Sequence, residues 1–234
     1  MAILVLGASG QLGTHLVPEL KKYYTKIDTP TSKQLNVLTD AIPDYNVIIN
    51  CVAWTNTVTA EDPNNWDKVL DLNMWLPKYI KSGYMNDKTK VFHISTDYVY
   101  DGDQPDSKES DVLKPFNKYG ISKALCDYAL LETAYLHLWI IRTSFKPKTW
   151  KHPVAFTDVM TNADTTDIIA GLISKLIHIR PTPGIYNVGT QTKSVYDLVK
   201  LNNPFINPAT LNIHNLNVSI KRNLTMDLTK FRNI

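Results

Sequence analysis

The chain has 234 residues, 44% of them hydrophobic and 20% charged, a composition typical of a folded globular protein rather than a disordered one. Its 25 Lys and Arg residues against 22 Asp and Glu residues give a net charge of +3, too small to indicate a nucleic-acid surface. Two cysteines exclude a disulfide framework, and no apolar stretch approaches the length of a membrane span. Met1 runs directly into an apolar strand, so no targeting segment is expected. We therefore expect a cytoplasmic protein that binds neither membrane nor nucleic acid and has no metal site.

Apolar runs alternate with helical patterns along the chain, and this alternation predicts the fold class. Five continuous runs are typical of buried strands: Ala2–Leu6, Val47–Cys51, Val91–Ile94, Leu138–Arg142 and Ile185–Val188. Helical periodicity fills much of the chain between them, at residues 11–24, Asn65–Tyr84, Tyr119–Ala134 and Thr166–His178. Buried strands separated by helices form parallel sheets covered on both faces. The sequence therefore predicts an α/β protein with a Rossmann-type, doubly wound parallel sheet.

The pattern also predicts two parts of unequal size. We expect a dinucleotide-binding domain over residues 1–145 and a small, reduced C-terminal substrate-binding lobe over residues 146–234. Within the second part, residues 165–190 are expected to return a helix and a strand to the first. From about Leu201 the chain is rich in Asn and weakly periodic, so this end of the lobe is expected to be irregular.

The glycine-rich segment GASGQLG follows the first strand and precedes the first helix. Gly7 would allow a tight turn, Gly10 would let backbone N–H groups approach a pyrophosphate, and Gly13 would let the helix pack closely on the strand. The helix N-terminus would then face the phosphates. A glycine pattern alone is weak, but its place between a buried strand and a helix supports dinucleotide binding. The alternative is a glycine-rich turn without a ligand.

The second strand bears on the choice of dinucleotide. An acid at its end would bind the ribose hydroxyls of NAD. In IDTPTSKQLNV we expect no acid at that end, because Asp28 is interpreted as lying within the strand. Thr31, Ser32 and Lys33 could instead accept a 2′-phosphate. The sequence favours NADPH, with NADH left open.

A tyrosine and a lysine four residues apart begin the third predicted helix. This spacing puts Tyr119 and Lys123 on one helix face, where the ammonium would stabilise a phenolate and prepare the tyrosine for proton exchange with a carbonyl oxygen. The pattern alone is common and usually marks a solvated face. Here a hydroxyl at the end of a buried strand, Thr96, stands 23 residues upstream and would polarise the same oxygen, with Ser95 as the alternative for that role.

At these residues the chain resembles the dTDP-4-dehydrorhamnose reductase family, within the extended short-chain dehydrogenase/reductase superfamily. The resemblance runs through nearly the whole length and is most specific at STDYVYDG followed by NKYGISK. It is carried by the stretches GASGQLG, VIINCVAWTNTVTAE, STDYVYDG, NKYGISK, IRTS, GIYNVG and LTMDLTKFR.

The resemblance implies a role for each matching residue. Catalysis would use Thr96, Tyr119 and Lys123. A nucleotide-sugar substrate would lie beside Asp97, Tyr98, Val99 and Phe145. The remaining matches would bind the dinucleotide together with Tyr119 and Lys123: Gly7, Ser9, Gly10, Gln11, Leu12 and Gly13 at the pyrophosphate, Asn36 and Val37 at the adenine end, and Val52, Ala53 and Thr55 along its path.

The implied activity is reduction of the 4-keto group of a nucleotide-activated 6-deoxy sugar by NADPH. The chain departs from the family in two places: Phe145 stands where a Trp is usual, and about twenty residues, largely a helix, are absent before FTDVMTNADTTDI. Three alternatives remain. They are a dinucleotide-binding regulatory subunit resembling the methionine adenosyltransferase β subunit, a combined epimerase/reductase, and an epimerase or dehydratase that recycles its cofactor. A homodimer is also left open.

Overall fold

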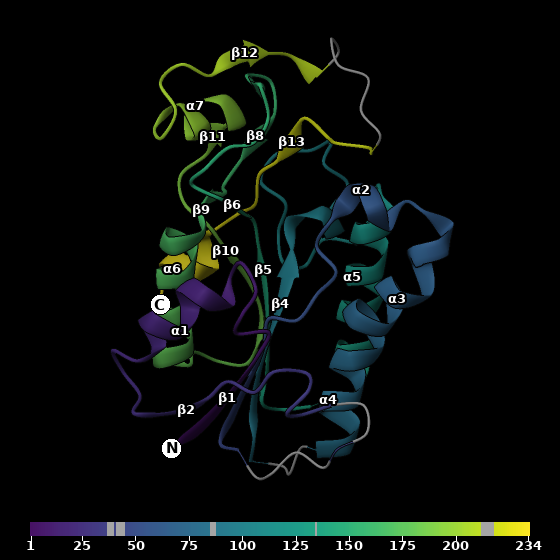
Figure 1. The fold of residues 1–234 in the computed structure, drawn as a ribbon, viewed down its shortest axis with the longest axis vertical. Coiled ribbons are helices and arrows are strands. Elements are labelled where there is room, and N and C mark those ends of the chain that lie inside the picture. The colour runs from purple at the N-terminus through teal and green to yellow at the C-terminus, as the bar shows by residue number, and fades with distance from the viewer. Residues whose placement is uncertain (37–39, 41–44, 85–87, 134, 212–217) are drawn as a thin grey trace.

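A six-stranded parallel sheet forms the centre of the computed structural model, which describes residues 1–36, 40, 45–84, 88–133, 135–211 and 218–234 (Figure 1). The strand order is β10-β5-β4-β3-β1-β2, and every neighbouring pair is parallel. From β1 the chain passes to β2 on one side, and from β2 it crosses back to β3 on the other side of β1. In open α/β sheets, such a reversal leaves a crevice at the carboxyl ends of the strands, where ligands bind. The strands are β1 (Ala2–Leu6), β2 (Lys26–Asp28), β3 (Val47–Asn50), β4 (Lys90–Thr96), β5 (Leu138–Thr143) and β10 (Gly184–Val188).

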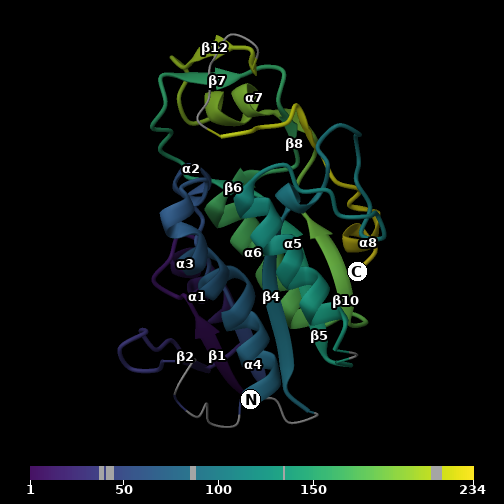
Figure 2. The same ribbon diagram turned by 90° about the vertical axis from the view of Figure 1, so that its right-hand side faces the viewer.

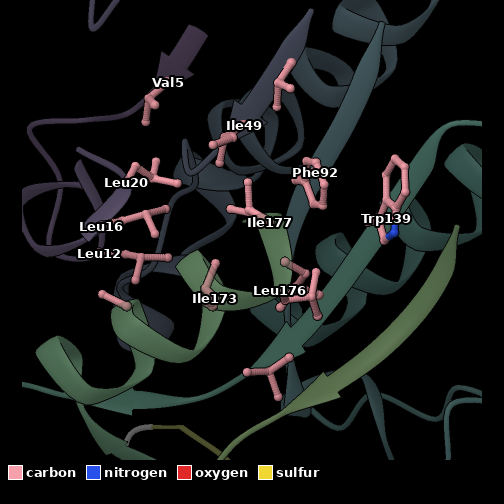
Figure 3. Packing of buried hydrophobic residues seen from close by; sticks show 14 of the residues in the cluster. Val5, Leu12, Leu16, Leu20, Ile49, Phe92, Trp139, Ile173, Leu176 and Ile177 are labelled. Atoms are coloured by element: carbon pink, nitrogen blue, oxygen red, sulfur yellow. The ribbon is translucent and has the colours of Figure 1, made fainter. Parts of the chain in front are cut away.

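Helices cover both faces of this sheet, as predicted for a doubly wound fold. Helices α1 (Gly13–Leu20) and α6 (Thr166–Ile179) pack on one face, while α4 (Leu76–Tyr84) and α5 (Lys118–Leu131) lie on the other (Figure 2). Figure 3 shows the core under α1 and α6, where Leu16 and Ile173 meet side chains of the sheet. Phe92 and Trp139, on neighbouring strands, stack at 4.6 Å between ring centroids within this core. The strands are therefore buried from both sides, which explains their continuous apolar sequences.

The helix predicted over Asn65–Tyr84 is divided in the structure. A 3₁₀ turn, η1 (Pro63–Asn65), leads into α3 (Trp66–Leu70), a π-helical turn η2 (Asp71–Trp75) and then α4. A short helix, α2 (Thr57–Ala60), precedes them. A π turn inserts one extra residue into a helix and frequently marks a functional position. Helical periodicity identified the segment, but it could not locate the inserted residue.

The small lobe at the top of Figure 1 is built from short strands around its own apolar cluster. One sheet has the order β11-β8-β13 and another pairs β12 with β7. The irregular segment expected from Leu201 onward is therefore a partial error, because it contains two strands and α8 (Thr229–Arg232). The lobe elements are β7 (Val154–Phe156), β8 (Met160–Thr161), β11 (Lys193–Ser194), α7 (Val195–Lys200), β12 (Asn207–Ala209) and β13 (Asn223–Leu224).

Contacts at β6 and at α8 are among those that connect the lobe to the sheet. Strand β6 (Phe145–Lys146), which follows β5, pairs in parallel with β9 (Asp164–Thr165), which leads into α6. Near the C-terminus, Phe231 on α8 is buried in the core beneath α1 and α6. The division of the chain at residue 145 stays a prediction. Within the described residues, no helix combines the length and apolar character needed to cross a membrane.

Candidate active site

A cavity of about 300 Å³ lies at the carboxyl ends of the central strands, below the lobe. It brings together residues from the glycine loop, the loop after β3, the end of β4, the start of α5 and the segment after β5. Of the residues predicted for cofactor, substrate or catalysis, eleven line it: Gly10, Gln11, Leu12, Ala53, Thr55, Thr96, Asp97, Tyr98, Tyr119, Lys123 and Phe145.

The glycine loop has the close backbone contacts that its sequence predicts. Gly7 has φ = 76°, and a Cβ built on it would lie 2.9 Å from the backbone of Cys51 at the end of β3. A Cβ on Gly13 would lie 2.3 Å from the carbonyl oxygen of Gly7, so α1 approaches the loop as only glycine permits. No acidic residue occupies the first turn of α1. The positive end of the helix dipole is thus available for a phosphate. Ser9 is exposed on this loop, outside the cavity lining.

The start of α5 sets the positions of the tyrosine and the lysine. The Asn117 side-chain oxygen caps the helix by accepting from the Gly120 N–H at 2.8 Å. A Cβ on Gly120 would lie 2.4 Å from the carbonyl oxygen of Tyr98, so this helix end packs directly on the turn η3 (Asp97–Val99) that follows β4. Thr96, Tyr119 and Lys123 consequently face the same cavity.

Electrostatics at Tyr119 favour the protonated phenol. Burial raises the pKa of Tyr119, and the negative charges of Asp97 and Asp127 raise it further, while a hydrogen bond with the Thr96 hydroxyl lowers it. The Tyr98 ring stands edge-on to the Tyr119 ring at 6.0 Å and covers it. A phenol in this environment holds its proton at neutral pH and can deliver it to an oxygen on which negative charge develops.

Lys123 is 1% exposed and bonded inward to β4. Its Nζ donates to the carbonyl oxygen of Ile94 at 2.7 Å and lies 3.0 Å from His93 Nε2. On the far side of the imidazole, Asn50 Nδ2 lies 3.2 Å from His93 Nδ1. Burial lowers the pKa of the Lys123 ammonium. Asn50 and His93 were missed at the sequence level, although each is a polar residue within an otherwise apolar run.

A second group of residues, which the sequence motifs did not identify, connects two walls of the cavity. Asn73 is fully buried in the π turn η2. Its side chain accepts from the backbone N–H of Trp54 at 2.7 Å and donates to the carbonyl oxygen of Trp54 at 3.1 Å. It also donates to Ser122 Oγ at 2.9 Å, and that hydroxyl donates to the Tyr119 carbonyl oxygen at 2.7 Å. The loop carrying Ala53 and Thr55 is thereby held to the helical turn that carries Tyr119.

Asp97 is a buried carboxylate at the boundary between sheet and lobe. Its Oδ1 accepts from the Thr96 hydroxyl at 2.9 Å, and only 2% of the residue is exposed. Burial raises the pKa of Asp97 to about 6, although the charge of Lys146 acts against this shift. Val99, predicted beside the sugar, is instead buried among apolar residues such as Tyr100 and is absent from the cavity lining.

The strand end predicted to lack an acid is corrected by the structure. Strand β2 ends on Asp28, whose Oδ2 accepts from the Tyr45 hydroxyl at 2.9 Å. The strand is shorter than its sequence suggested, because its parallel pairing with β1 ends where Asp28 lies opposite Leu4. Asp28 and Tyr45 line a shallow pocket on the side expected for the adenosine.

The other predicted residues of this side lie outside that pocket. Asn36 is exposed, and Val37 falls outside the described residues. Val52 donates its backbone N–H to Asn50 but does not line the main cavity. No group of three His, Cys, Asp or Glu side chains suited to a metal ion occurs in the part of the chain that the structure describes.

The strand order, the glycine loop between β1 and α1, and a tyrosine–lysine pair facing a strand-end hydroxyl define a Rossmann-type α/β fold of the short-chain dehydrogenase/reductase kind. The model of the family described as RmlD substrate binding domain matches residues 1–171. The chain belongs to this family.

Known proteins similar to the chain agree with this assignment. A dTDP-4-dehydrorhamnose reductase of Mycobacterium tuberculosis is 29% identical over 153 residues, which cover 61% of this chain and 49% of that protein. The methionine adenosyltransferase 2 subunit beta of Bos taurus is 28% identical over 144 residues, covering 56% and 42%. The chain thus spans about half the length of these curated relatives. A crystal structure of dTDP-4-dehydrorhamnose reductase from Bacillus anthracis in complex with NADP superimposes with a TM-score of 0.82 at 22% identity, covering 100% of this chain and 92% of that one.

Proposed function

We propose that the protein reduces the 4-keto group of a nucleotide-activated 6-deoxy sugar with NADPH, with dTDP-4-dehydro-L-rhamnose or a close analogue as substrate. The observation that carries the proposal is the meeting of Thr96, Tyr119 and Lys123 in one cavity with the glycine loop. The names of the relatives, a dTDP-4-dehydrorhamnose reductase and a reductase structure in complex with NADP, favour the same chemistry.

The proposed residues divide the work between orientation and proton transfer. The dinucleotide supplies a hydride when bound. Its pyrophosphate would lie at the glycine loop and the N-terminus of α1, whose close packing Gly7 and Gly13 permit because a Cβ at either position would meet backbone atoms. Tyr119 donates its phenolic proton to the substrate oxygen. The Thr96 hydroxyl, whose hydrogen Asp97 Oδ1 accepts in the free protein, turns to donate to the same oxygen. Asp97 and Tyr98, which line the cavity on the lobe side, contact the sugar. Phe145, at the start of β6, supplies an apolar wall.

The cofactor is proposed to be NADPH, with NADH as a second cofactor. The exposed Thr31, Ser32 and Lys33 follow β2 and suit a 2′-phosphate. Asp28 suits the ribose hydroxyls of NADH, but the Tyr45 hydroxyl already occupies one of its oxygens.

The direct test is consumption of NADPH by the purified protein in the presence of dTDP-4-dehydro-L-rhamnose, generated by a separate epimerase. The expected result is substrate-dependent loss of absorbance at the nicotinamide band with formation of the 4-hydroxy sugar. NADPH binding without any turnover of 4-keto sugar nucleotides would overturn the proposal.

The second candidate is a dinucleotide-binding regulatory subunit, which the similarity to methionine adenosyltransferase 2 subunit beta supports. This candidate predicts that the protein binds NADPH and alters the activity of a methionine adenosyltransferase without reducing any sugar.

A further inference from the structure

Two buried polar side chains behind Lys123 have no part in the proposed reaction so far. Asn50 at the end of β3 and His93 within β4 lie opposite each other in the strand register, and each is 1% exposed. Their contacts form a chain: Asn50 Nδ2 to His93 Nδ1 at 3.2 Å, then His93 Nε2 to Lys123 Nζ at 3.0 Å. Buried polar groups of this kind need matched donors and acceptors, so the chain fixes where its hydrogens lie.

The Asn50 amide has one orientation that satisfies its neighbours. Its Oδ1 faces the backbone N–H of Val52 at 3.1 Å. A backbone N–H only donates, so the atom opposite it must be the oxygen and the amide NH₂ must face His93. Because that NH₂ also only donates, His93 Nδ1 accepts. A neutral imidazole with an accepting Nδ1 carries its hydrogen on Nε2.

This tautomer of His93 determines the protonation state that Lys123 can adopt. The Nε2–H of His93 points at Lys123 Nζ, and an ammonium group offers hydrogens but no lone pair. A charged Lys123 would therefore set two donors against each other at 3.0 Å. A neutral amine accepts the Nε2–H with its lone pair and still donates to the Ile94 carbonyl oxygen at 2.7 Å. Burial lowers the pKa of both Lys123 and His93, in agreement with an uncharged pair.

We propose that Asn50 and His93 are positioning residues that hold Lys123 as a neutral amine in the free protein, and that binding of the dinucleotide charges it. The second half of this statement rests on the proposed function. The pyrophosphate brings negative charge to the cavity and the ribose brings hydroxyl acceptors, both of which favour an ammonium. The amine takes one proton from solvent, and its Nζ turns from the imidazole toward the ribose.

The structure offers the released imidazole hydrogen another acceptor. Cys126 Sγ lies 3.5 Å from His93 Nε2, within reach of a hydrogen bond to sulfur. The other groups near Lys123 do not supply a competing free charge. Burial raises the pKa of the Cys51 and Cys126 thiols to about 12, and Asp127 is paired with Arg142 at 2.9 Å. The phenol of Tyr119, whose pKa is raised by burial, is neutral as well. The activating charge beside Tyr119 would thus appear only when cofactor is present.

The first test needs no cofactor. The tautomer of His93 is read from the ¹⁵N shifts of its two ring nitrogens, assigned with the variant His93→Gln. We expect the Nε2–H tautomer in the wild type between pH 7 and 8. The variant Cys126→Ala, which keeps the contacts to Asn50 and Lys123, should show the same tautomer. An Nδ1–H tautomer or an imidazolium in the wild type, or a changed tautomer in Cys126→Ala, would overturn the proposal.

The second test uses the variant Asn50→Asp to reverse the direction of the hydrogen bonds from residue 50 through His93 to Lys123. A carboxylate accepts from both the Val52 N–H and His93, so the imidazole proton moves to Nδ1 and Nε2 accepts from a charged lysine. We measure the Kd of NADP⁺ from pH 7 to pH 10, together with proton uptake by calorimetry in buffers of different ionisation enthalpy. The wild type should take up close to one proton and lose affinity by up to tenfold per pH unit, because binding is linked to that proton. Asn50→Asp should show a flatter profile and less uptake.

The two proposals fail in different ways. Equal pH slopes in wild type and Asn50→Asp would overturn the charging of Lys123. Absence of NADP⁺ binding at any pH would overturn the proposed function and the charging step, while the free-protein tautomer would still decide the first half of the inference. If Asn50→Asp does not fold, the tautomers of the wild type and Cys126→Ala, and proton uptake by the wild type, decide the matter.

Discussion

The parallel sheet and the small lobe above it are held together by different interactions. In the sheet, β3 and β5 are buried at every residue, and apolar contacts on both faces fix their positions. In the lobe, strands of two or three residues are tied by polar side chains. Asn162 bonds to the backbone of Thr190 and Met226, and Asp158 accepts from the Leu211 N–H at 2.8 Å. The sheet therefore depends mainly on its packing, whereas the lobe combines a smaller apolar cluster with individual hydrogen bonds.

The candidate site lies where these two regions meet. Thr96, Tyr119 and Lys123 are carried by the sheet and its helix α5, while the apolar cluster of the lobe packs against Tyr98 in the cavity wall. The comparison leads us to expect that the positions of Thr96, Tyr119 and Lys123 depend mainly on the sheet and α5. The lobe is expected to influence which molecule is admitted. The experiments below separate these contributions, from the largest expected effect to the smallest.

Removing the Tyr119 hydroxyl should abolish chemistry without loosening either region. Tyr119→Phe is expected to lower kcat by about 10²–10⁴-fold, because the positioned acid is lost, while NADPH binding stays close to wild type. Lys123→Ala should impair both turnover and cofactor binding. Stopped-flow turnover and fluorescence titration of NADPH measure the two effects. Near-normal turnover by Tyr119→Phe would remove the catalytic assignment.

Truncation of one apolar side chain in each core compares the two regions. Phe92→Ala in the sheet core should lower the free energy of unfolding by about 3–5 kcal/mol. Val159→Ala in the lobe core, where two methyl groups are lost, should cost roughly 1–2 kcal/mol. Urea denaturation followed by circular dichroism gives both values, and hydrogen exchange should show that the Val159 variant opens first in the lobe. Equal destabilisation by the two variants would contradict the division between packing and tethering.

The Asp97 carboxylate, at the boundary between the sheet and the lobe, should lower the free energy of unfolding. The pKa of Asp97 in the folded protein is about 6, above the usual 3.8, so its destabilising contribution is complete above pH 6 and absent below about pH 4. Stability due to this group therefore falls as the pH rises through that window. Asp97→Asn is expected to be more stable than wild type at pH 7.5 by on the order of 3 kcal/mol, with the difference vanishing toward pH 4. It should also be less active. Urea midpoints at both pH values test this, and a pH-independent difference would argue against it.

Substitutions at the β2 edge of the sheet should change the preference between NADPH and NADH without affecting the lobe. Asp28→Ser removes a negative charge near the expected 2′-phosphate and should shift the ratio of KM values toward NADPH by about tenfold. Its matched partner, Tyr45→Phe, frees the carboxylate from its hydrogen bond and should shift the ratio toward NADH. Steady-state titration of both cofactors at fixed sugar measures the shifts. Movement of both variants in the same direction would mean that Asp28 does not face the ribose.

The last prediction is that the protein has no epimerase activity. Epimerisation at C3 and C5 needs an acid/base pair beside the 4-keto group. Among the described residues that line the cavity, Asp97 carries the one carboxyl group, and its pKa is about 6. Burial raises the pKa of Tyr98 and raises that of the Cys51 thiol to about 12, so both stay protonated at neutral pH. Incubation with dTDP-4-keto-6-deoxyglucose in D₂O without NADPH should leave the C3 and C5 protons unexchanged. Enzyme-dependent deuterium at either carbon would favour the combined epimerase/reductase.

What could be predicted from the sequence follows the same division. The apolar runs located β1 and β3–β5 to within two residues, and the motifs led to Thr96, Tyr119 and Lys123, because local patterns encode both. The lobe strands escaped because pairs such as β13 with β8 join distant segments without a periodic pattern.

Errors within the site have equally specific causes. Val99 directly follows Asp97 and Tyr98 in the sequence, yet the turn η3 directs it into the core. The end of β2 at Asp28 depends on tertiary pairing with β1 and was not visible in the sequence. Asn50, His93 and Asn73 gain their importance from partners more than 15 residues away, which a motif cannot express.

The π turn η2 has a further consequence for the evolution of the family. A helix advances by about 100° per residue, so the extra residue of a π turn rotates everything beyond it relative to what precedes it. Asn73 reaches both Trp54 and Ser122 from within that turn. Deleting a single residue between Asp71 and Trp75 would restore a regular helix, while turning Asn73 or the whole of α4 away from its partners. We expect length changes to be tolerated in the surface loops of the lobe and selected against in this one helical turn.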